Sequence, residues 1–304
     1  MIMDCAIIGG GPAGLNAALV LGRSRRQVVL FDDNKPRNAV THESHGFITR
    51  DGVKPAEFRE IAHRDVAKYP SVQVKRERVT GVTQDGGNGG LFELQTESGE
   101  TIQARNVILA AGLKETYPAI SGFRDYYGKS LFSCPYCDGW ELQDKQLVVI
   151  SENDHAFHMT KLVTNWSQDV VLCTNGSDSL TPEQRDKLAS KGIPVYDQKI
   201  ASLAGDNGLL TKVVFEDGTE VMRAGGFVTP GWSNASASFA EALGCELNSL
   251  QGIVTDVLGR TNIKGVYAAG DTTFSGPAQL VLAAAEGSRA AIGVNSDLID
   301  LDFN

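Results

Sequence analysis

Two of the five cysteines, Cys134 and Cys137, lie close together in the stretch SCPYCDGWEL, and Asp138 directly follows the second of them. The C-x-x-C spacing is typical of redox-active thiol pairs and of one half of a zinc site. A structural zinc ion takes four ligands. The sequence has no second C-x-x-C, and pairing with His155 and His158 fits the usual spacings only loosely. The stretch therefore favours a redox pair, and we predict no metal site.

The other cysteines, Cys5, Cys173 and Cys245, are isolated and are interpreted as small buried hydrophobic residues. The chain reaches the apolar stretch DCAIIGGG almost at once, which leaves no room for a signal peptide. No stretch approaches the roughly 20 apolar residues that span a bilayer. We therefore expect a cytoplasmic protein that makes no membrane contact. In that compartment a C-x-x-C pair is more often catalytic or metal-binding than structural.

A glycine-rich turn, with Gly9, Gly11 and Gly14 in the pattern G-x-G-x-x-G, separates an expected strand from an expected helix. The first glycine permits the tight turn, the second lets a pyrophosphate approach the backbone, and the third lets helix and strand pack closely. The start of the helix offers free N–H groups to the phosphates. Asp32 closes the next apolar run, where a carboxylate can accept hydrogen bonds from ribose hydroxyls. The pattern predicts a dinucleotide site.

The remaining elements alternate between strands and helices. We expect an amphipathic helix over 54–68, a strand meander over 71–112, a second strand–helix–strand unit over 145–174, and a hairpin over 208–222. A strand at 265–269 is followed by a long helix of small residues. This order predicts an α/β fold with two Rossmann-like dinucleotide-binding domains, the second inserted in the first.

Four motifs in this order carry a resemblance to a known family: IIGGGPAG, VILAAG at 107–112, CPYCDG, and GVYAAGD at 265–271. Together they resemble low-molecular-weight thioredoxin reductases over nearly the whole chain. The resemblance implies FAD as cofactor, a homodimer, and electron exchange between flavin and the cysteine pair. A glutaredoxin-type domain also carries Cys-Pro-Tyr-Cys, but there the pair opens a helix, whereas here we expect a strand as the next element.

The resemblance also implies roles for individual residues. Cys137 is the flavin-proximal sulfur, Cys134 its partner, and Asp138 the general acid. Asp271 meets the ribityl or phosphate region of FAD, and a helix that starts near Gln279 points its N-terminus at the isoalloxazine. The residues expected to bind FAD are Gly9, Gly11, Pro12, Ala13, Gly14, Asp32, Asn38, His45, Val79, Ala111, Gly112, Gly270, Asp271, Gln279 and Leu280. Residues 1–113 and 245–304 form the expected FAD domain, and residues 114–244 form the inserted one.

The chain departs from the family at the second nucleotide site. Where the family has a glycine-rich GGGDSA, this chain has the sequence from Ser151 to Ala156, with Glu152 at a position that would face a pyrophosphate. No Lys or Arg occurs between Lys161 and Arg185, where the family grips the 2′-phosphate. Side chains and like charge oppose phosphate binding. We therefore expect no productive binding of NADPH.

This loss leaves three functions open. One is a thioredoxin reductase that uses ferredoxin or another donor in place of NADPH, and acts on thioredoxin or a small disulfide. The second is a dithiol oxidase that passes electrons to oxygen; such oxidases typically have a histidine where this chain has Asp138, so the reductase is preferred. The third is a flavin-binding redox sensor without turnover, against which the intact cysteine pair argues.

Two further expectations concern charge and the end of the chain. The formal net charge is −9 without a long basic run, which argues against a nucleic-acid partner. The sequence ends in LIDLDFN, and we consider whether Phe303 covers the flavin where a nicotinamide would stack.

Overall fold

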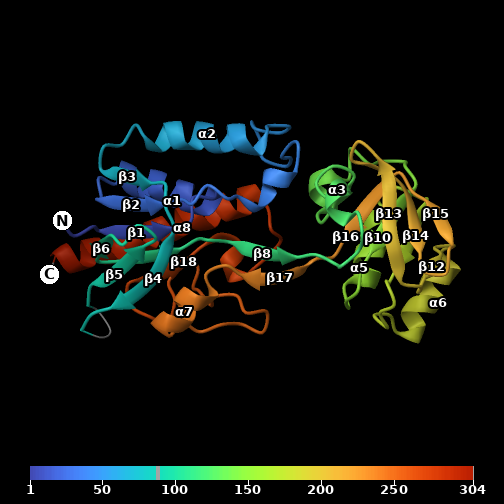
Figure 1. The fold of residues 1–304 in the computed structure, drawn as a ribbon. Coiled ribbons are helices and arrows are strands. Elements are labelled where there is room, and N and C mark those ends of the chain that lie inside the picture. Colours follow the sequence, from blue (N-terminus) through green and yellow to red (C-terminus); the bar gives the residue numbers. More distant parts are fainter. Residues whose placement is uncertain (87–89, 304) are drawn as a thin grey trace.

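The computed structural model describes residues 1–86 and 90–303, which form two lobes joined by a narrow connection (Figure 1). The first lobe is built on a five-stranded parallel sheet of order β18-β7-β1-β2-β3. Its strands are β1 (Cys5–Ile8), β2 (Val28–Phe31), β3 (Val72–Lys75), β7 (Val107–Leu109) and β18 (Val266–Ala268). All but β3 are buried throughout, as their continuous apolar runs require.

Alternating side chains of β1 divide the core of this lobe in two. Cys5 and Ile7 pack with the helices α1 (Pro12–Arg23), α2 (Pro55–Val66) and α8 (Leu280–Phe303). Ala6 and Ile8 point to the other face and pack with α7 (Ala237–Leu243) and an antiparallel meander of β4 (Val79–Gln84), β5 (Phe92–Thr96) and β6 (Thr101–Ala104). The period of two along a strand produces this division.

The second lobe repeats the plan. Its parallel sheet has the order β12-β11-β10-β16-β9, from β9 (Leu131–Phe132), β10 (Leu147–Ile150), β11 (Val170–Cys173), β12 (Val195–Tyr196) and β16 (Gly225–Val228). One face is covered by α5 (Ala156–Val163) and α6 (Pro182–Ser190). The other face is covered by α3 (Phe123–Tyr126) and the meander β13 (Ile200–Asp206), β14 (Leu209–Phe215) and β15 (Glu220–Met222). The α/β fold with two Rossmann-like sheets is therefore confirmed.

A two-stranded ribbon joins the lobes. β8 (Leu113–Thr116) leaves the first lobe, and β17 (Gly231–Asn234) returns to it antiparallel to β8. Figure 1 shows both strands passing side by side between the two lobes. Two 3₁₀ turns, η1 (Arg37–Val40) and η2 (Gly270–Thr273), belong to the first lobe, and a short helix, α4 (Pro135–Asp138), belongs to the second.

The structure corrects several expectations. β3 and β7 join the parallel sheet rather than a meander, because each pairs with a buried strand of the βαβ unit. The cysteine pair does open a helix, α4, although of one turn only. Ala240 and Leu243 of α7 pack in the first lobe, so we draw the second domain boundary at the end of β17 rather than at 244/245. This division into domains is a proposal.

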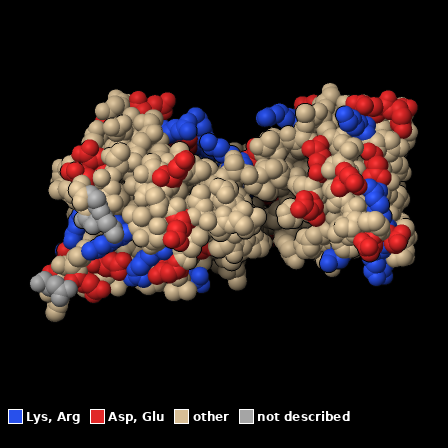
Figure 2. All heavy atoms as spheres, turned by 90° about the horizontal axis from the view of Figure 1, so that it is seen from below, with Lys and Arg blue, Asp and Glu red and all other residues tan. Residues whose placement is uncertain are grey.

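The surface in Figure 2 narrows between the lobes, and on the face drawn Lys and Arg are interspersed with Asp and Glu. That face shows no continuous basic track of the kind that follows a phosphate backbone. In the part of the chain that the structure describes, no helix is long and apolar enough to cross a membrane.

Candidate active site

Cys134 and Cys137 form a disulfide at the start of α4, with their Cα atoms 5.2 Å apart. Cys134 is the N-cap residue, and its carbonyl accepts hydrogen bonds from the N–H groups of Cys137 at 3.0 Å and Asp138 at 3.1 Å. Both cysteines are half-buried, while Tyr136 between them is exposed. One helical turn therefore brings the two sulfurs together at a position that thiols can reach.

Asp138 lies directly behind the disulfide. Its burial, together with the nearby Glu141 carboxylate, raises the pKa of Asp138 to about 7, although His45 opposes the shift. A carboxyl with this pKa changes protonation near neutral pH, which suits a general acid or base. The position and the electrostatics agree with the proton-transfer role that the family resemblance implies.

His45 comes from the first lobe and meets the second. It lies in the loop between η1 and α2, and its Nε2 is 3.7 Å from the carboxylate of Glu141. The same ring lies 3.6 Å from Asp51 and 3.7 Å from Glu43. The sequence predicts that His45 contacts FAD; the structure shows that it also lies against the segment that carries the disulfide.

The glycines of the G-x-G-x-x-G loop occupy three different environments. Gly9 has φ +118°, and a Cβ there would lie 2.3 Å from the carbonyl oxygen of Ala110. A Cβ on Gly14 would lie 1.8 Å from the carbonyl oxygen of Gly9, so the turn packs directly against α1. A Cβ on Gly11 would meet no protein atom within 4 Å. The space beside Gly11 is therefore open, as the approach of a pyrophosphate requires.

Several expected residues surround the start of α1. Pro12 is its first residue, Ala13 is buried, and no side chain caps the helix. Gly270 of η2 adopts φ +77°, and a Cβ there would lie 2.8 Å from the Cβ of Ala13. Gly287 of α8 packs against the carbonyl of Ala13. The loop, η2 and the first turns of α8 thus converge on one place.

The remaining expected residues lie along the same edge or in the core. Gln279 immediately precedes α8, and its carbonyl accepts from the N–H of Ala283, so the helix begins where predicted, at Leu280. Ala111 and Gly112 follow β7. Asn38 lies in η1. The side chain of Val79 packs in the core, which leaves only its backbone for a cofactor contact.

Asp32 is bound by basic side chains, and its contact with a ribose stays a prediction. Its carboxylate accepts from Arg59 at 2.7 Å and from Arg76 at 2.8 Å, and lies 3.1 Å from His63. Burial alone would raise the pKa of Asp32, but His63, the Asn34 N–H and the two arginines together lower it. Asp32 also lies against Gly10, where a Cβ would be 2.2 Å from its Cγ. Its main role here is to anchor α2 beside the loop.

These residues fit FAD. The cradle at Gly11 is open, the N–H groups at the start of α1 have no side-chain cap, and the buried Nε of Arg59 has no hydrogen-bond partner. An uncapped helix start binds phosphate, and an unpaired buried donor calls for an acceptor. Gly9, Gly11, Gly14 and Asp271 would hold the cofactor from this lobe.

In the loop that corresponds to the family's second nucleotide site, polar side chains form hydrogen bonds with neighbouring groups of the protein. The side chain of Asn153 accepts from the N–H of His155 at 3.1 Å, just before α5. The carboxylate of Glu152 is bound by the side chain of Asn175 after β11. The hydroxyl of Thr229 donates to that of Ser151 at 2.6 Å. No glycine stands in this loop, so its backbone is covered by side chains.

The tail lies away from this edge. Asp302 is bound by Arg26 at 2.9 Å and by Arg105 at 2.8 Å, which lie two residues before the starts of β2 and β7 respectively. Gly9 and Gly112 lie at the opposite, carboxyl ends of the same sheet. Phe303 is 91% exposed. The idea that Phe303 covers the flavin of its own chain is therefore wrong.

Several residues at this site carried a weak sequence signal or none. Arg59 and His63 are spaced i, i+4 on the predicted helix 54–68, which could have indicated a basic face. Arg37, Glu115 and Trp232 are far apart in sequence and showed no pattern. Cys5 and Cys173 are fully buried, as predicted, and burial raises the pKa of Cys173 to about 12. Among residues 1–86 and 90–303, no group of three His, Cys, Asp or Glu could hold a metal ion.

Comparison with known proteins decides the family. A model of the pyridine nucleotide-disulphide oxidoreductases matches residues 3–287. The chain belongs to this family. Members bind FAD, and this pyridine nucleotide-disulphide oxidoreductase is a flavin disulfide oxidoreductase of the thioredoxin reductase type.

Individual relatives agree with this assignment. The oxidoreductase is 33% identical to the thioredoxin reductase tcpT of Claviceps purpurea, over 89% of this chain and 86% of that one. It is 52% identical to TrxB of Bacillus anthracis, whose crystal structure is described as that of a thioredoxin reductase by assignment. The TM-score is 0.94, and 99% of each chain is covered. The crystal structure of HlmI has 35% identity and a TM-score of 0.94, with coverage of 99% of this chain and 94% of that one.

Proposed function

We propose that this flavin disulfide oxidoreductase passes electrons between FAD and the Cys134–Cys137 disulfide without using NADPH. The observation that carries the proposal is the glycine-free loop after β10, where Glu152 and Asn153 already bind other groups of the protein. The chemistry at the disulfide and the missing phosphate contacts each support one part of it.

The disulfide is the group that exchanges electrons with the substrate. FAD, when bound, supplies the two-electron exchange. Two electrons and two protons convert the disulfide of Cys134 and Cys137 to two thiols, and a thiolate then reduces a substrate disulfide by exchange. Asp138, with a pKa of about 7, holds or gives one of these protons beside the sulfurs. By resemblance, Cys137 faces the flavin and Cys134 faces the substrate.

Two observations support independence from NADPH. At the start of α5, Asn153 already binds a backbone N–H, and Glu152 sets negative charge beside it. A pyrophosphate needs free N–H groups and a close approach to the backbone. The nearest downstream arginine, Arg185, is paired with Asp197 at 2.7 Å, so its charge is already neutralised. A 2′-phosphate would therefore lose its partner as well.

The proposal also covers the substrate, the electron donor, the oligomeric state and the cellular location. Relatives are named thioredoxin reductases, and the half-buried disulfide beside the exposed Tyr136 suits a protein thiol or a small disulfide as substrate. Ferredoxin, or another donor that delivers electrons to the flavin without a nicotinamide, takes the place of NADPH. A homodimer and a cytoplasmic location are part of the proposal; the unpaired Cys5, Cys173 and Cys245 suit a reducing compartment.

A dithiol oxidase is the second candidate: an aspartate at position 138 is typical of the reductases, but its raised pKa suits the base of an oxidase. Because the pKa of Asp138 is raised to about 7, its carboxylate can accept a proton from a dithiol slightly above neutral pH. In this direction Cys134 and Cys137 take two electrons from the substrate dithiol, and FAD, when bound, would supply the chemistry that passes them to oxygen.

Anaerobic spectroscopy of the flavin tests the proposal. Purified protein receives NADPH, then reduced ferredoxin, then dithiothreitol, while the visible absorbance of the flavin is followed. We expect no rapid bleaching by NADPH, and bleaching by dithiothreitol that is lost when Cys134 and Cys137 are replaced by serine. Rapid bleaching by micromolar NADPH would overturn the proposal. Fast oxygen consumption with a small dithiol would favour the oxidase, and a disulfide that never exchanges electrons with flavin would indicate a sensor.

A further inference from the structure

Arg37 joins both lobes through the ribbon. Its Nη1 lies 3.1 Å from the carboxylate of Glu115 on β8, and its Nη2 lies 3.1 Å from that of Asp271 in η2. The guanidinium also lies over the ring of Trp232 on β17, 5.2 Å from the ring centroid. One side chain of the first lobe therefore contacts both connecting strands and an expected cofactor residue.

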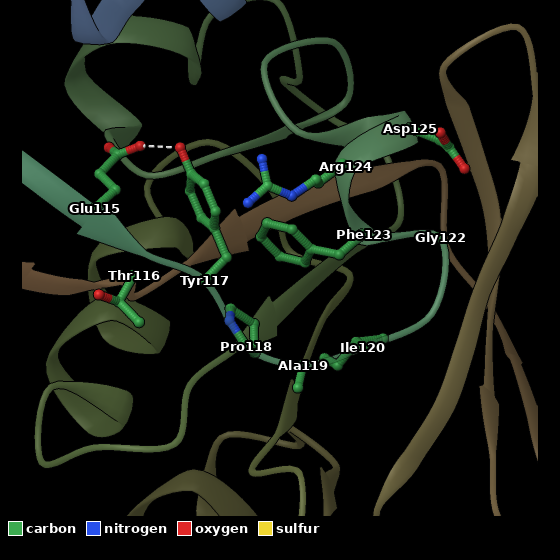
Figure 3. Close-up of a pocket in the computed structure, with 10 residues that line it drawn as sticks. All are labelled: Glu115, Thr116, Tyr117, Pro118, Ala119, Ile120, Gly122, Phe123, Arg124 and Asp125. Carbon is green, nitrogen blue, oxygen red and sulfur yellow. Dashed lines mark hydrogen bonds between the residues drawn. The ribbon is translucent and has the colours of Figure 1, made fainter.

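Glu115 extends this contact into the inserted lobe. Its side chain is only 4% exposed, and it accepts from the hydroxyls of Tyr117 and of Tyr127, the latter at 2.9 Å. Burial and the Glu115 carboxylate raise the pKa of both tyrosines, so both keep their protons and donate. Figure 3 shows the Glu115 carboxylate joined to the Tyr117 hydroxyl, at the rim of a pocket with Phe123 and Arg124 beside the Tyr117 ring.

A backbone contact lies next to this network. Gly128, just after α3, has φ +80°, and a Cβ there would lie 2.4 Å from the carbonyl oxygen of Val40 in η1. Only glycine permits both this approach and this backbone conformation. η1 and the inserted lobe therefore touch directly, without intervening side chains.

The contact of His45 with Glu141, at 3.7 Å, is a third one from the same segment. We call Arg37, Val40 and His45, which contact Glu115, Gly128 and Glu141 respectively, the clasp. All three come from a stretch of the first lobe that includes η1. Their partners lie on the ribbon, after α3 and after α4, so one contact of the clasp lies next to the helix that carries the disulfide.

We propose that the clasp fixes the orientation of the inserted lobe, and that Arg37 and Glu115 are positioning residues for electron exchange between the disulfide and the flavin. A two-stranded ribbon is only marginally stable by itself, so it does not fix an orientation. A misplacement of about 1 Å can cost a reaction roughly 100-fold. The inference rests on the proposed function, because it concerns the same disulfide and cofactor.

The substitution Glu115→Gln tests the clasp. It keeps the size of the side chain but removes the charge that pairs with Arg37 and replaces one of the two acceptor oxygens by an NH2 donor. We expect the limiting rate of flavin reduction by dithiothreitol to fall 10- to 100-fold, while the dithiothreitol concentration for half-maximal rate and the FAD content stay unchanged. Small-angle X-ray scattering should show a larger radius of gyration. Lys212→Gln, which breaks the pair between Lys212 and Glu220 on the far meander, is the matched control.

A second variant covers the case in which Glu115→Gln does not fold. Gly128→Ala pushes directly against Val40, so it should separate the lobes and slow flavin reduction while the ion pair remains. If either folded variant keeps the wild-type rate within twofold and the wild-type scattering curve, the clasp does not position the lobe. If the wild type itself shows no flavin reduction, the proposed function fails, and the scattering comparison still decides whether the clasp holds the lobes.

Discussion

The side chain of Asn153 accepts a hydrogen bond from the backbone N–H of His155 at 3.1 Å, directly before α5. In the first lobe, the corresponding loop before α1 carries Gly9 and Gly11, which have no side chains to occupy it, although neither helix start has a side-chain cap. The two Rossmann-like lobes therefore differ in the loop before the helix: space is open beside Gly11 in the first lobe, whereas Glu152 and Asn153 bind groups of the protein itself in the second.

This difference predicts how ligands stabilise the protein. A ligand at 100 times its Kd adds about 2.7 kcal/mol to the free energy of unfolding. Added FAD should raise the melting temperature of the apoprotein, whereas millimolar NADPH should leave that of the holoprotein unchanged. Asn153→Ala should lower the free energy of unfolding by about 1 kcal/mol, as loss of a typical hydrogen bond does, without creating an NADPH response. A melting shift with NADPH in the wild type would contradict this prediction.

Replacing Gly11 by alanine should affect FAD binding, whereas replacing Gly14 by alanine should affect the stability of the apoprotein. A Cβ on Gly11 meets no protein atom, so Gly11→Ala should keep the melting temperature of the apoprotein but weaken FAD binding, because the methyl group fills the space of the pyrophosphate. Gly14→Ala collides with the Gly9 carbonyl and should destabilise the apoprotein itself. Gly81→Ala, with only ordinary contacts in β4, is the control for both. FAD titration and thermal melting separate the two effects.

Asp138 should set the pH dependence of electron exchange. Because its pKa is raised to about 7, the carboxyl carries a proton below that pH and loses it above. Reduction of an added disulfide, in which the carboxyl donates, should slow as pH rises through about 7. Oxidation of an added dithiol, in which the carboxylate accepts, should accelerate over the same range. Asp138→Asn should flatten both profiles and slow exchange roughly 100-fold, as measured by stopped-flow absorbance.

Substitutions of Glu141 and His45, two neighbours of Asp138, should shift the midpoint of this pH profile in opposite directions. Glu141 raises the pKa of Asp138, so Glu141→Gln should shift the midpoint to lower pH; His45 lowers it, so His45→Gln should shift the midpoint to higher pH. His45 is itself faced by Glu43, Asp51 and Glu141, and these groups must be counted in the fit. Shifts of the same sign in both variants would show that another group controls the profile.

Asp32 should matter more for stability than for catalysis. Its pKa is lowered in the folded protein, so it contributes stability above the ordinary aspartate range, and this contribution is lost as pH falls through the folded pKa. Asp32→Asn leaves Arg59, His63 and Arg76 without their shared carboxylate and should cost about 3 kcal/mol in urea unfolding at neutral pH. Asp33→Asn, at the exposed neighbouring position, should change little. Equal effects of the two substitutions would refute the role of the cluster.

Local patterns predicted much of this site. The spacing of Gly9, Gly11 and Gly14 determines a turn within a few residues, so its geometry follows from the sequence. The start of α8 at Leu280 was also predictable, as was the pairing of Cys134 with Cys137.

Contacts between distant segments were not predictable in this way. Arg37 meets Glu115, Trp232 and Asp271 only because the ribbon and η2 bring them together, and no spacing in the sequence encodes that. The ion pairs of Asp32 could not be predicted either, because its cationic partners, Arg59 and Arg76, lie on other elements. The prediction that Phe303 covers the flavin is wrong because the packing of α8 on α1 sets the direction of the helix, and the sequence of the tail does not.

The ribbon of β8 and β17 makes the inserted lobe a separable unit of the chain. Because the polypeptide enters and leaves the inserted lobe on two adjacent antiparallel strands, everything between Tyr117 and Pro230 could be transplanted without altering the strand order of the first sheet. A new cassette would then have to match the recipient at Val40 and His45, the two clasp residues that contact the cassette itself.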